Sequence, residues 1–345
     1  MTPLVSVVID TYNHEHFIED AIRSALDQDF PRSRMEILVI DDGSTDRTPE
    51  IVRKFEPQVR LLRKQNGGQA SAISFGAARA TGKFVAFLDG DDVWLPSKLS
   101  RVAQEFAKDP RTVMVYHRYT IWDFQDGSLR EPVGFAEISG DILADKLKQR
   151  LFTGAMTSAL AFRRDCLCRV MPVPDKCSYM QDIYLIATIS CLGPVSCVPE
   201  RLTKYRIHGQ NLYFLRPREF NLRVLESRVG TWQAVIRSAE GWIRVNTSEK
   251  TLHGMRFLLR RWRVALDADR FRLNRPGRLG EFVHLCRYVL VEAPAKSLGD
   301  VLFMWLKTFA FLIVGRHAHY LEGIRTRARR IAGHFRQRLG PAETQ

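Results

Sequence analysis

The sequence lacks an apolar run long enough to cross a membrane. A spanning helix needs about 18 or more apolar residues in succession. The longest comparable stretch, VLFMWLKTFAFLIV at 301–314, is short and contains Lys307. The first residues, MTPLVSVVID, also lack the basic segment and apolar stretch that begin a secretory signal peptide. We therefore expect a cytoplasmic protein without a membrane-spanning helix.

Cysteine is scarce as well, with six residues in a chain of 345. These cysteines have neither the spacing of a zinc site nor the density of a disulfide-stabilised secreted domain. Their pattern agrees with a reducing compartment, where thiols stay free. The six are Cys166, Cys168, Cys177, Cys191, Cys197 and Cys286.

Acidic residues are scarce only towards the C-terminus. Residues 221–345 contain 23 Lys and Arg against 10 Asp and Glu, a net charge of +13, whereas residues 1–220 carry only +1. The charge therefore divides the chain near residue 220. Apolar residues at steps of three and four also predict a helix near the C-terminus. These residues are Leu321, Ile324, Ala328, Ile331, Phe335 and Leu339.

Two interpretations of this basic region remain open. It can dock on an anionic membrane, with arginines meeting lipid headgroups and apolar side chains entering the interface. Alternatively, it is a helical appendage packed on the rest of the chain, with a solvated arginine face. A nucleic-acid partner is not expected, because no nucleic-acid-binding motif accompanies the charge. The apolar side chains in question are Trp305, Phe309, Phe311 and Leu312.

The N-terminal half alternates apolar, β-branched runs with helical periodicity. Short strand–helix repeats of this kind predict an α/β fold, a mostly parallel sheet flanked by helices and joined by right-handed crossovers. From residue 221 onward the pattern becomes mainly helical. The expected strands are 4–9, 35–40, 59–62 and 84–88, and helices are expected within 17–26, 48–55 and 66–82.

Polar clusters follow three of the expected strands. They read DTYN at 10–13, DDGS at 41–44 and DGDD at 89–92. Ligands of such sheets bind outside the carboxyl ends of the strands, so we expect the three clusters to form one site. The carboxylates of Asp89, Asp91 and Asp92 would repel one another unless a cation lay among them. A plain acidic turn or a helix cap at Asp92 is the alternative.

Five motifs, in order, resemble family 2 glycosyltransferases of the GT-A fold. The resemblance covers about residues 4–215 and implies a GT-A-like catalytic domain at 1–220, with a basic helical region at 221–345. It further implies a nucleotide-sugar donor, a divalent metal held by an Asp-x-Asp motif, and inversion at the anomeric carbon. The motifs are VSVVIDTYNHEHFIEDAIRSALDQDF, ILVIDDGSTDRTPEIV, NGGQASAISFGAARATG, FVAFLDGDDVWLPSKL and YRIHGQN.

The resemblance implies a donor site that accepts a nucleotide sugar, with a uridine nucleotide expected. The loop of Thr11, Tyr12 and Asn13 is expected to cradle the base, and Asp42 to read the edge of the base. Asp89 is expected near the ribose or a metal-bound water. The turn before Gln69 can contact the donor through backbone N–H groups, although Gly-Gly is usually only a turn.

The resemblance also implies a site for Mn²⁺ or Mg²⁺. Asp91 is expected to be the direct ligand, since these hard cations prefer carboxylate oxygens. His208 is a second candidate ligand, because imidazole is an accepted partner of Mn²⁺. A lone histidine beside a loop is otherwise an ordinary hydrogen-bonding residue, and that alternative stays open.

Asp182 is expected to be the catalytic base that removes the proton of the acceptor hydroxyl. It lies before an apolar helical stretch, where burial would raise its pKa, although an N-cap role is compatible. Gln181 departs from the family pattern, which often has Glu-Asp here. This departure puts acceptor contacts and the tuning of the pKa of Asp182 in doubt.

Together these features predict an inverting, metal-dependent glycosyltransferase. Its acceptor is expected to be a glycan or a lipid-linked glycan of a surface polysaccharide, met at the cytoplasmic face of a membrane. A nucleotidyltransferase is disfavoured, because DTYNHEH replaces the glycine-rich phosphate loop that should follow the first strand. A catalytically silent basic scaffold that binds membrane or nucleic acid remains the alternative outside enzymes.

Overall fold

The computed structural model describes residues 3–132, 135–143, 154–209, 211 and 219–245, together with parts of 252–270. The chain forms two compact units, Met1–Arg263 and Val264–Gln345. The helix predicted around Leu321–Leu339 and the apolar stretch 301–314 lie outside the described residues. The division at residue 220 that the charge suggests stays a prediction.

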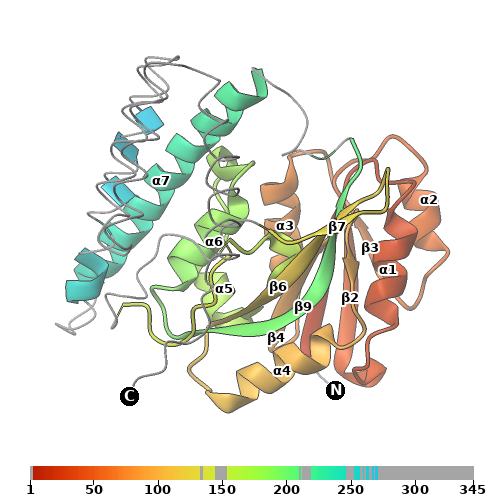
Figure 1. Ribbon diagram of the computed structural model, residues 1–345, viewed down its shortest axis with the longest axis horizontal. Helices are drawn as coiled ribbons and strands as arrows, with labels where there is room; N and C mark the ends of the chain where they lie inside the picture. The colour runs from red at the N-terminus through yellow and green to blue at the C-terminus, as the bar shows by residue number, and fades with distance from the viewer. Residues whose placement is uncertain are drawn as a thin grey trace, which may run out of the picture. The chain divides into compact units, whose positions relative to one another are not determined.

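A single nine-stranded sheet forms the centre of the first unit (Figure 1). The strand order is β3-β2-β1-β4-β8-β6-β9-β5, and β7 pairs with β6. Strands β1 to β5 are Val5–Thr11, Met35–Asp41, Arg60–Arg63, Phe84–Asp89 and Val93–Trp94, and strands β6 to β9 are Met114–Asp123, Leu129–Arg130, Leu160–Arg163 and Val195–Ile207.

The half of the sheet made by β3, β2, β1 and β4 is entirely parallel, which confirms the predicted parallel core. Strand β8 then runs antiparallel to both β4 and β6, so the complete sheet is mixed. Strands β6 and β9 pair in parallel along most of their length. Their pairing shifts register twice between His117 and Tyr119, and it is regular from the Tyr119–Thr203 pair onward.

Helices cover both faces of the parallel half (Figure 1). Strands β1, β2 and β4 are buried along almost their whole length, and most of their residues are apolar, as expected for parallel strands covered on both faces. Val5, Val7 and Ile9 pack in one core cluster with residues of α1 and α4. The helices are α1 Ile18–Leu26, α2 Thr48–Arg53, α3 Gln69–Ala77, α4 Lys98–Lys108, α5 Arg164–Val170, α6 Gln181–Ile189 and α7 Glu219–Val245.

Helix α3 approaches the other face of the sheet through Gly76. A Cβ atom at this position would lie 2.4 Å from Cγ1 of Val8 and 3.0 Å from Cγ1 of Ile40. The small-residue sequence of α3 therefore lets its backbone come close to β1 and β2. Among the described residues, no helix combines the length and apolar character that a membrane crossing requires.

We expect Gly76→Ala to destabilise the protein by about 1–3 kcal/mol, because the added methyl group overfills a packed core. Chemical denaturation monitored by circular dichroism measures this change. The matched control is Gly241→Ala in α7, where no atom lies within 4 Å of the added Cβ. There, alanine should keep or raise stability, by up to about 1 kcal/mol, since glycine is a poor helix former. Equal effects of the two substitutions would contradict the close packing of α3.

Candidate active site

The three polar clusters meet at the carboxyl edge of the parallel strands, as the sequence predicts. Asp10 on β1 pairs with Asp89 on β4, and Thr11 pairs with Asp41 on β2. Each cluster therefore begins within one residue of its neighbour along the same edge.

The loop after β1 is fixed to the loop after β2. Asn13 has a positive φ of 55°, a conformation that asparagine tolerates better than most residues. Its backbone N–H donates to Oγ of Ser44 at 2.9 Å, and its Oδ1 accepts from the backbone N–H of Thr45 at 2.8 Å. The ring of Tyr12 remains 43% exposed. This loop thus presents an aromatic face beside a rigid polar frame.

Asp42 is buried, and its carboxylate holds the turn before α3. It accepts from Nζ of Lys64 at 2.5 Å and from the backbone N–H of Gly68 at 2.7 Å. The N–H of Gly67 lies 3.1 Å from both carboxylate oxygens. Most of the accepting capacity of Asp42 is therefore used within the protein. Its expected role in reading the base stays a prediction.

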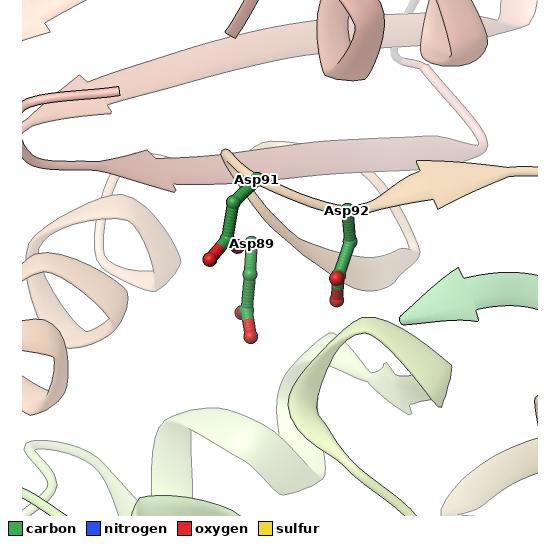
Figure 2. Close-up of side chains that lie close together, drawn as sticks. All are labelled: Asp89, Asp91 and Asp92. Carbon is green, nitrogen blue, oxygen red and sulfur yellow. The ribbon is translucent and has the colours of Figure 1, made fainter. Parts of the chain in front are cut away.

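Three carboxylates crowd together directly after β4. One oxygen from each of Asp89, Asp91 and Asp92 lies within 4.8 Å of the others (Figure 2). Repulsion at this distance in a buried setting is costly unless each charge is compensated or neutralised. The three residues differ in how their charges are compensated or neutralised, and this difference distinguishes their roles.

Asp92 has a structural role. It is fully buried, its Oδ2 accepts from the hydroxyl of Ser158 at 2.6 Å, and its Oδ1 accepts from the backbone N–H of Arg206 at 2.9 Å. Burial, followed by the charge of Asp91, raises the pKa of Asp92 well above its usual range. The strand β5 follows Asp92 directly, so this residue does not cap a helix.

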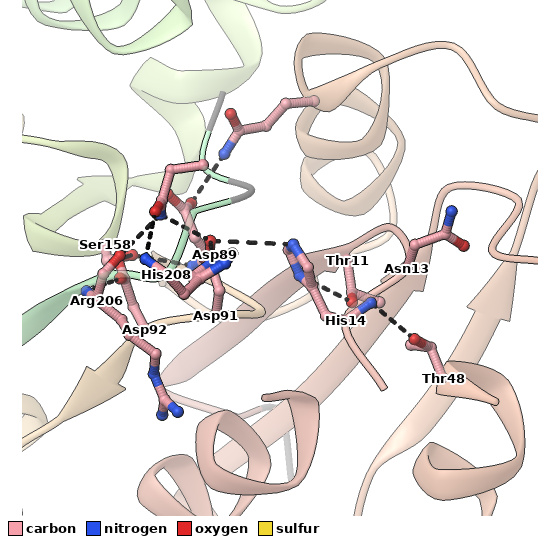
Figure 3. A network of polar contacts seen from close by, with 12 residues as sticks. Thr11, Asn13, His14, Thr48, Asp89, Asp91, Asp92, Ser158, Arg206 and His208 are labelled. Carbon is pink, nitrogen blue, oxygen red and sulfur yellow. Dashed lines mark hydrogen bonds and ion pairs between the residues drawn. The ribbon is translucent and has the colours of Figure 1, made fainter. Parts of the chain in front are cut away.

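Asp91 lies between two imidazoles (Figure 3). Its Oδ2 is 3.0 Å from Nε2 of His208 and 3.9 Å from Nε2 of His14. Burial raises the pKa of Asp91, but the charge of His14 and the hydrogen bond of His208 outweigh it, so its pKa is below the usual value. Asp91 is therefore the member of the group that stays ionised and can attract a cation.

His208 is held beside Asp91 by packing. Its side chain is 2% exposed, and its ring centroid is 4.2 Å from that of Phe17. Its Nδ1 has no hydrogen-bond partner among the described residues. The structure thus brings together the two residues expected to hold the metal, and their role as ligands stays a prediction. His14, to which sequence reasoning gave no role, reaches the same carboxylate from the loop after β1.

Asp89 is joined to α3 through its side chain. Its Oδ1 accepts from Nε2 of Gln69 at 2.9 Å, and its backbone N–H donates to Oγ of Ser158 at 2.9 Å. Burial raises its pKa well above the usual range, and the charges of Asp10 and Asp92 raise it further. Burial and the charge of Asp91 likewise raise the pKa of Asp10 to about 8. A bound cation would favour the ionised form of both carboxyl groups.

Lys98 and Trp94 support the acidic group through the carbonyl oxygen of Ser158. Nζ of Lys98 donates to the carbonyl oxygen of Ser158 at 2.8 Å and lies 3.4 Å from the centre of the Trp94 ring. Trp94 also donates to that carbonyl through Nε1, at 2.9 Å. Burial holds the pKa of Lys98 well below its usual range. Ser158 is therefore the centre of this support, although nothing in its sequence surroundings marks it.

Arg206 links the acidic group to the aromatic side chains near α1. Its side chain is completely buried, and Nη2 donates to Oδ2 of Asp20 at 2.8 Å. The guanidinium lies 4.7–5.0 Å from the ring centres of Phe17, Trp122 and Phe124. The backbone N–H of the same residue donates to Asp92, so Arg206 joins β9 both to the acidic group and to α1.

Asp182 lies in the first turn of α6. Burial raises its pKa to about 6, so it is ionised at neutral pH and still basic enough to accept a proton. Its Oδ1 accepts from the backbone N–H of Ile183 at 2.7 Å. Helix α6 begins at Gln181, with Met180 as the N-cap residue, so Asp182 is not the cap.

The donor set at this edge fits a divalent cation of the Mg²⁺ or Mn²⁺ type. Both oxygens of Asp92 are occupied by hydrogen bonds. This leaves Asp91, the second oxygen of Asp89 and the imidazole of His208. One or two carboxylates are what Mg²⁺ usually takes from a protein, with water and phosphate oxygens completing the shell. Carboxylate oxygens suit both Mg²⁺ and Mn²⁺ better than an imidazole does, so Asp91 is the principal ligand in this set.

Residues 6–168 match the model of the family Glycosyl transferase family 2. This part of the chain is a glycosyltransferase family 2 domain. The match begins in β1 and ends in α5, so it includes all three polar clusters and the acidic group.

Curated relatives of this chain are named as glycosyltransferases. An uncharacterized glycosyltransferase of Nostoc sp. is 36% identical over 218 residues, which are 60% of this chain and 66% of that protein. An uncharacterized glycosyltransferase of Rickettsia bellii is 27% identical over 220 residues, 63% of this chain and 31% of that protein. The chain thus spans less than two thirds of the length of these relatives.

Solved structures support the GT-A-like fold. S. aureus TarS 1–349 in complex with UDP-GlcNAc superposes with a TM-score of 0.58 at 17% identity, covering 92% of this chain and 87% of that one. The mannosyltransferase PcManGT from Pyrobaculum calidifontis, in complex with GDP-Man and Mn²⁺, has a TM-score of 0.51 at 20% identity, covering 94% and 85%. At these identities the likeness establishes the fold alone.

Proposed function

We propose that this family 2 domain transfers a sugar from a nucleotide-sugar donor to a hydroxyl group, with inversion and with the help of a divalent cation. The observation that carries the proposal is the pairing of two carboxylates with opposite tuning. Asp91 is held ionised between imidazoles, while burial keeps the pKa of Asp182 near 6. The first suits a cation, and the second suits a proton acceptor.

The donor lies along the edge formed by β1, β2 and β4 in this proposal. Tyr12 stacks on the base, with Thr11 and Asn13 shaping its pocket. Asp42 reads the base through its remaining accepting capacity, and Asp89 and Gln69 line the path of the ribose and sugar. The uridine preference comes from the family resemblance, and complexes of neighbours with UDP-GlcNAc and GDP-Man support a nucleotide-sugar donor in general.

Asp91 and His208, with Asp89 beside them, would hold Mn²⁺ or Mg²⁺. When bound, the cation would neutralise the charge that develops on the diphosphate leaving group. The protein prepares this step by keeping Asp91 ionised and by fixing the imidazole of His208 against Phe17. Lys98 and Ser158 keep the strand end in place without contacting the donor.

Asp182 acts as the base in the proposed reaction. The acceptor oxygen bonds to the anomeric carbon while the bond from that carbon to the diphosphate oxygen breaks. The proton of the acceptor hydroxyl moves to Oδ2 of Asp182, because Oδ1 accepts from Ile183. Proton removal by a positioned base contributes roughly 10²–10⁴ in rate. Attack opposite to the leaving group inverts the anomeric configuration.

A panel of nucleotide sugars tests the reaction. With Mn²⁺ or Mg²⁺, we expect one donor to release nucleoside diphosphate, and EDTA to abolish the release. Asp91→Ala should lower the rate by roughly 100-fold or more, since several kcal/mol of charge stabilisation depend on the cation. Asp126→Ala, in an exposed loop, is the matched control. Release of diphosphate that is unaffected by EDTA and by Asp91→Ala would contradict the proposed cation site.

The pH dependence tests the role of Asp182. Because its pKa is about 6, we expect the rate to be constant above that pH and to fall about tenfold per unit below it. The groups that face Asp182 electrostatically are Asp89 and the hydroxyl of Tyr119. Gln181→Glu adds a like charge and should move the acidic limb upward by roughly one pH unit. The matched control is Gln104→Glu, at an exposed position of α4, which should leave the acidic limb unchanged. A limb that ignores Gln181→Glu would argue against Asp182 as the base.

We further propose that the acceptor is a glycan or lipid-linked glycan of a surface polysaccharide, and that the basic region holds the enzyme peripherally at the cytoplasmic face of the membrane. The net charge of +13 in residues 221–345 supports docking on an anionic membrane. Each arginine near an anionic surface is worth about 1 kcal/mol. Changing four arginines to glutamine should therefore weaken binding to phosphatidylglycerol vesicles by roughly 100-fold or more. The four are Arg325, Arg327, Arg329 and Arg330.

Vesicle flotation of the full chain measures this binding. The matched control removes the same charge from four exposed arginines of the first unit, which should leave binding nearly unchanged. They are Arg23, Arg53, Arg79 and Arg111. Binding to neutral phosphatidylcholine vesicles that equals binding to anionic ones, or equal losses in the two variants, would favour the solvated-appendage interpretation.

A further inference from the structure

Two glutamines join the acidic group to the helix that carries Asp182. Gln69 is the first residue of α3 and Gln181 the first residue of α6. Nε2 of Gln69 donates to Oδ1 of Asp89 at 2.9 Å, and Nε2 of Gln181 donates to Oε1 of Gln69 at 2.6 Å. We name Asp89, Gln69 and Gln181 the amide relay. It spans 112 residues between its two glutamines.

The direction of this relay follows from its hydrogen-bond geometry. The NH₂ group of Gln69 faces Oδ1 of Asp89 and donates to it. The carbonyl oxygen of Gln69 then points to Gln181 and requires a donor, which a glutamine supplies and an ionised glutamate does not. Gln181 in turn exposes its own carbonyl oxygen at the far end. The relay therefore ends in an acceptor.

This terminal acceptor is unsatisfied. Gln181 is 6% exposed, and its Oε1 is buried without a hydrogen-bond partner among the described residues. Buried polar atoms nearly always have a partner, and an exception at a site points to a ligand or an ordered water. With Asp89 in the relay and Asp182 next in the chain, an anionic ligand group is disfavoured here. A neutral hydroxyl is the donor that fits.

The position of the relay indicates which hydroxyl this is. In the proposed reaction, the transferred sugar lies between the leaving diphosphate, near Asp89 and Asp91, and the attacking hydroxyl, near Asp182. Gln181 is hydrogen-bonded through Gln69 to Asp89, on the side of the leaving diphosphate. It also directly precedes Asp182, on the side of the attacking hydroxyl. It consequently borders the transferred sugar rather than the nucleotide.

We propose that Oε1 of Gln181 accepts a hydrogen bond from a hydroxyl of the transferred sugar, so that the amide relay selects the donor sugar. This inference rests on the proposed function. It also gives a reason for glutamine where the family often has glutamate. An acid at 181 would add another like charge beside Asp89 and Asp182, whereas an amide keeps an accepting oxygen without that charge.

Binding measurements on the full chain with Mn²⁺ test the relay. The probes are UDP-glucose, UDP-galactose, UDP-N-acetylglucosamine and GDP-mannose, each beside UDP or GDP alone. The wild type should bind one sugar nucleotide more tightly than its nucleoside diphosphate. Gln181→Met should weaken that complex by roughly 10- to 100-fold, as expected for a lost hydrogen bond to a buried acceptor site. Binding of UDP or GDP alone should not change.

Deoxy analogues of the preferred sugar nucleotide locate the hydroxyl. The wild type should discriminate against one analogue by a similar factor, and Gln181→Met should lose that discrimination only. Gln181→Asn, which keeps an amide but is one methylene shorter, should behave in the same way and replaces the methionine variant if that variant no longer binds the free nucleotide. Gln104→Met on α4 is the matched control.

Two outcomes separate the failures. If the wild type binds a sugar nucleotide and Gln181→Met or Gln181→Asn keeps the same preference among deoxy analogues, the relay does not read the sugar, and the proposed function stands. A wild type that binds none of the sugar nucleotides or nucleoside diphosphates would overturn the proposed function and the relay with it.

Discussion

Electrostatic repulsion among carboxylates is the constraint on which the rest of this structure depends. Asp10, Asp89, Asp91 and Asp92 are brought together because three polar clusters end parallel strands at one edge of a sheet. Water cannot screen these charges fully, since the groups are largely buried. Each carboxyl group must therefore be neutralised, hydrogen-bonded or paired. The surrounding residues can be understood as different solutions to this one problem.

The other half of the sheet, made by β8, β6, β9 and β5, supplies most of those solutions. Ser158 precedes β8 and holds both Asp89 and Asp92, while β9 contributes the backbone N–H of Arg206 and leads to His208. Helix α4 adds Lys98 beneath the same carbonyl. The parallel half thus concentrates negative charge, and elements later in the chain stabilise it. The catalytic geometry depends on both halves being assembled.

The sequence predicted the parallel strands and the edge where they end, because β-branched runs and polar turns are local signals. Motifs that resemble those of the family also placed Asp91 and His208 in one site, and the structure brings these two side chains together. The roles of these residues and of Asp182 stay predictions. The sequence did not reveal Ser158, Lys98 or His14 as neighbours of the acidic group, since their contacts join residues far apart along the chain. The bond between Gln69 and Gln181 was equally hidden, because nothing local relates the first residues of two distant helices. The hydrogen bonds of Asp42 to the turn before α3 were hidden for the same reason, because they join residues far apart along the chain.

The shifted pairing between β6 and β9 bears on how this site tolerates changes in chain length. Between the pairs His117–Val198 and Tyr119–Thr203, β9 contains more residues than β6, and from Thr203 onward the pairing is regular. Residues added or lost at such an irregularity are absorbed locally by bulging of one strand. The hydrogen bonds of Arg206 to Asp92 and of His208 to Asp91 therefore keep their spacing along the chain. An insertion at this irregularity can therefore lengthen β9 and change the rim of the sheet. The site at the carboxyl end of β9 is unaffected by such an insertion.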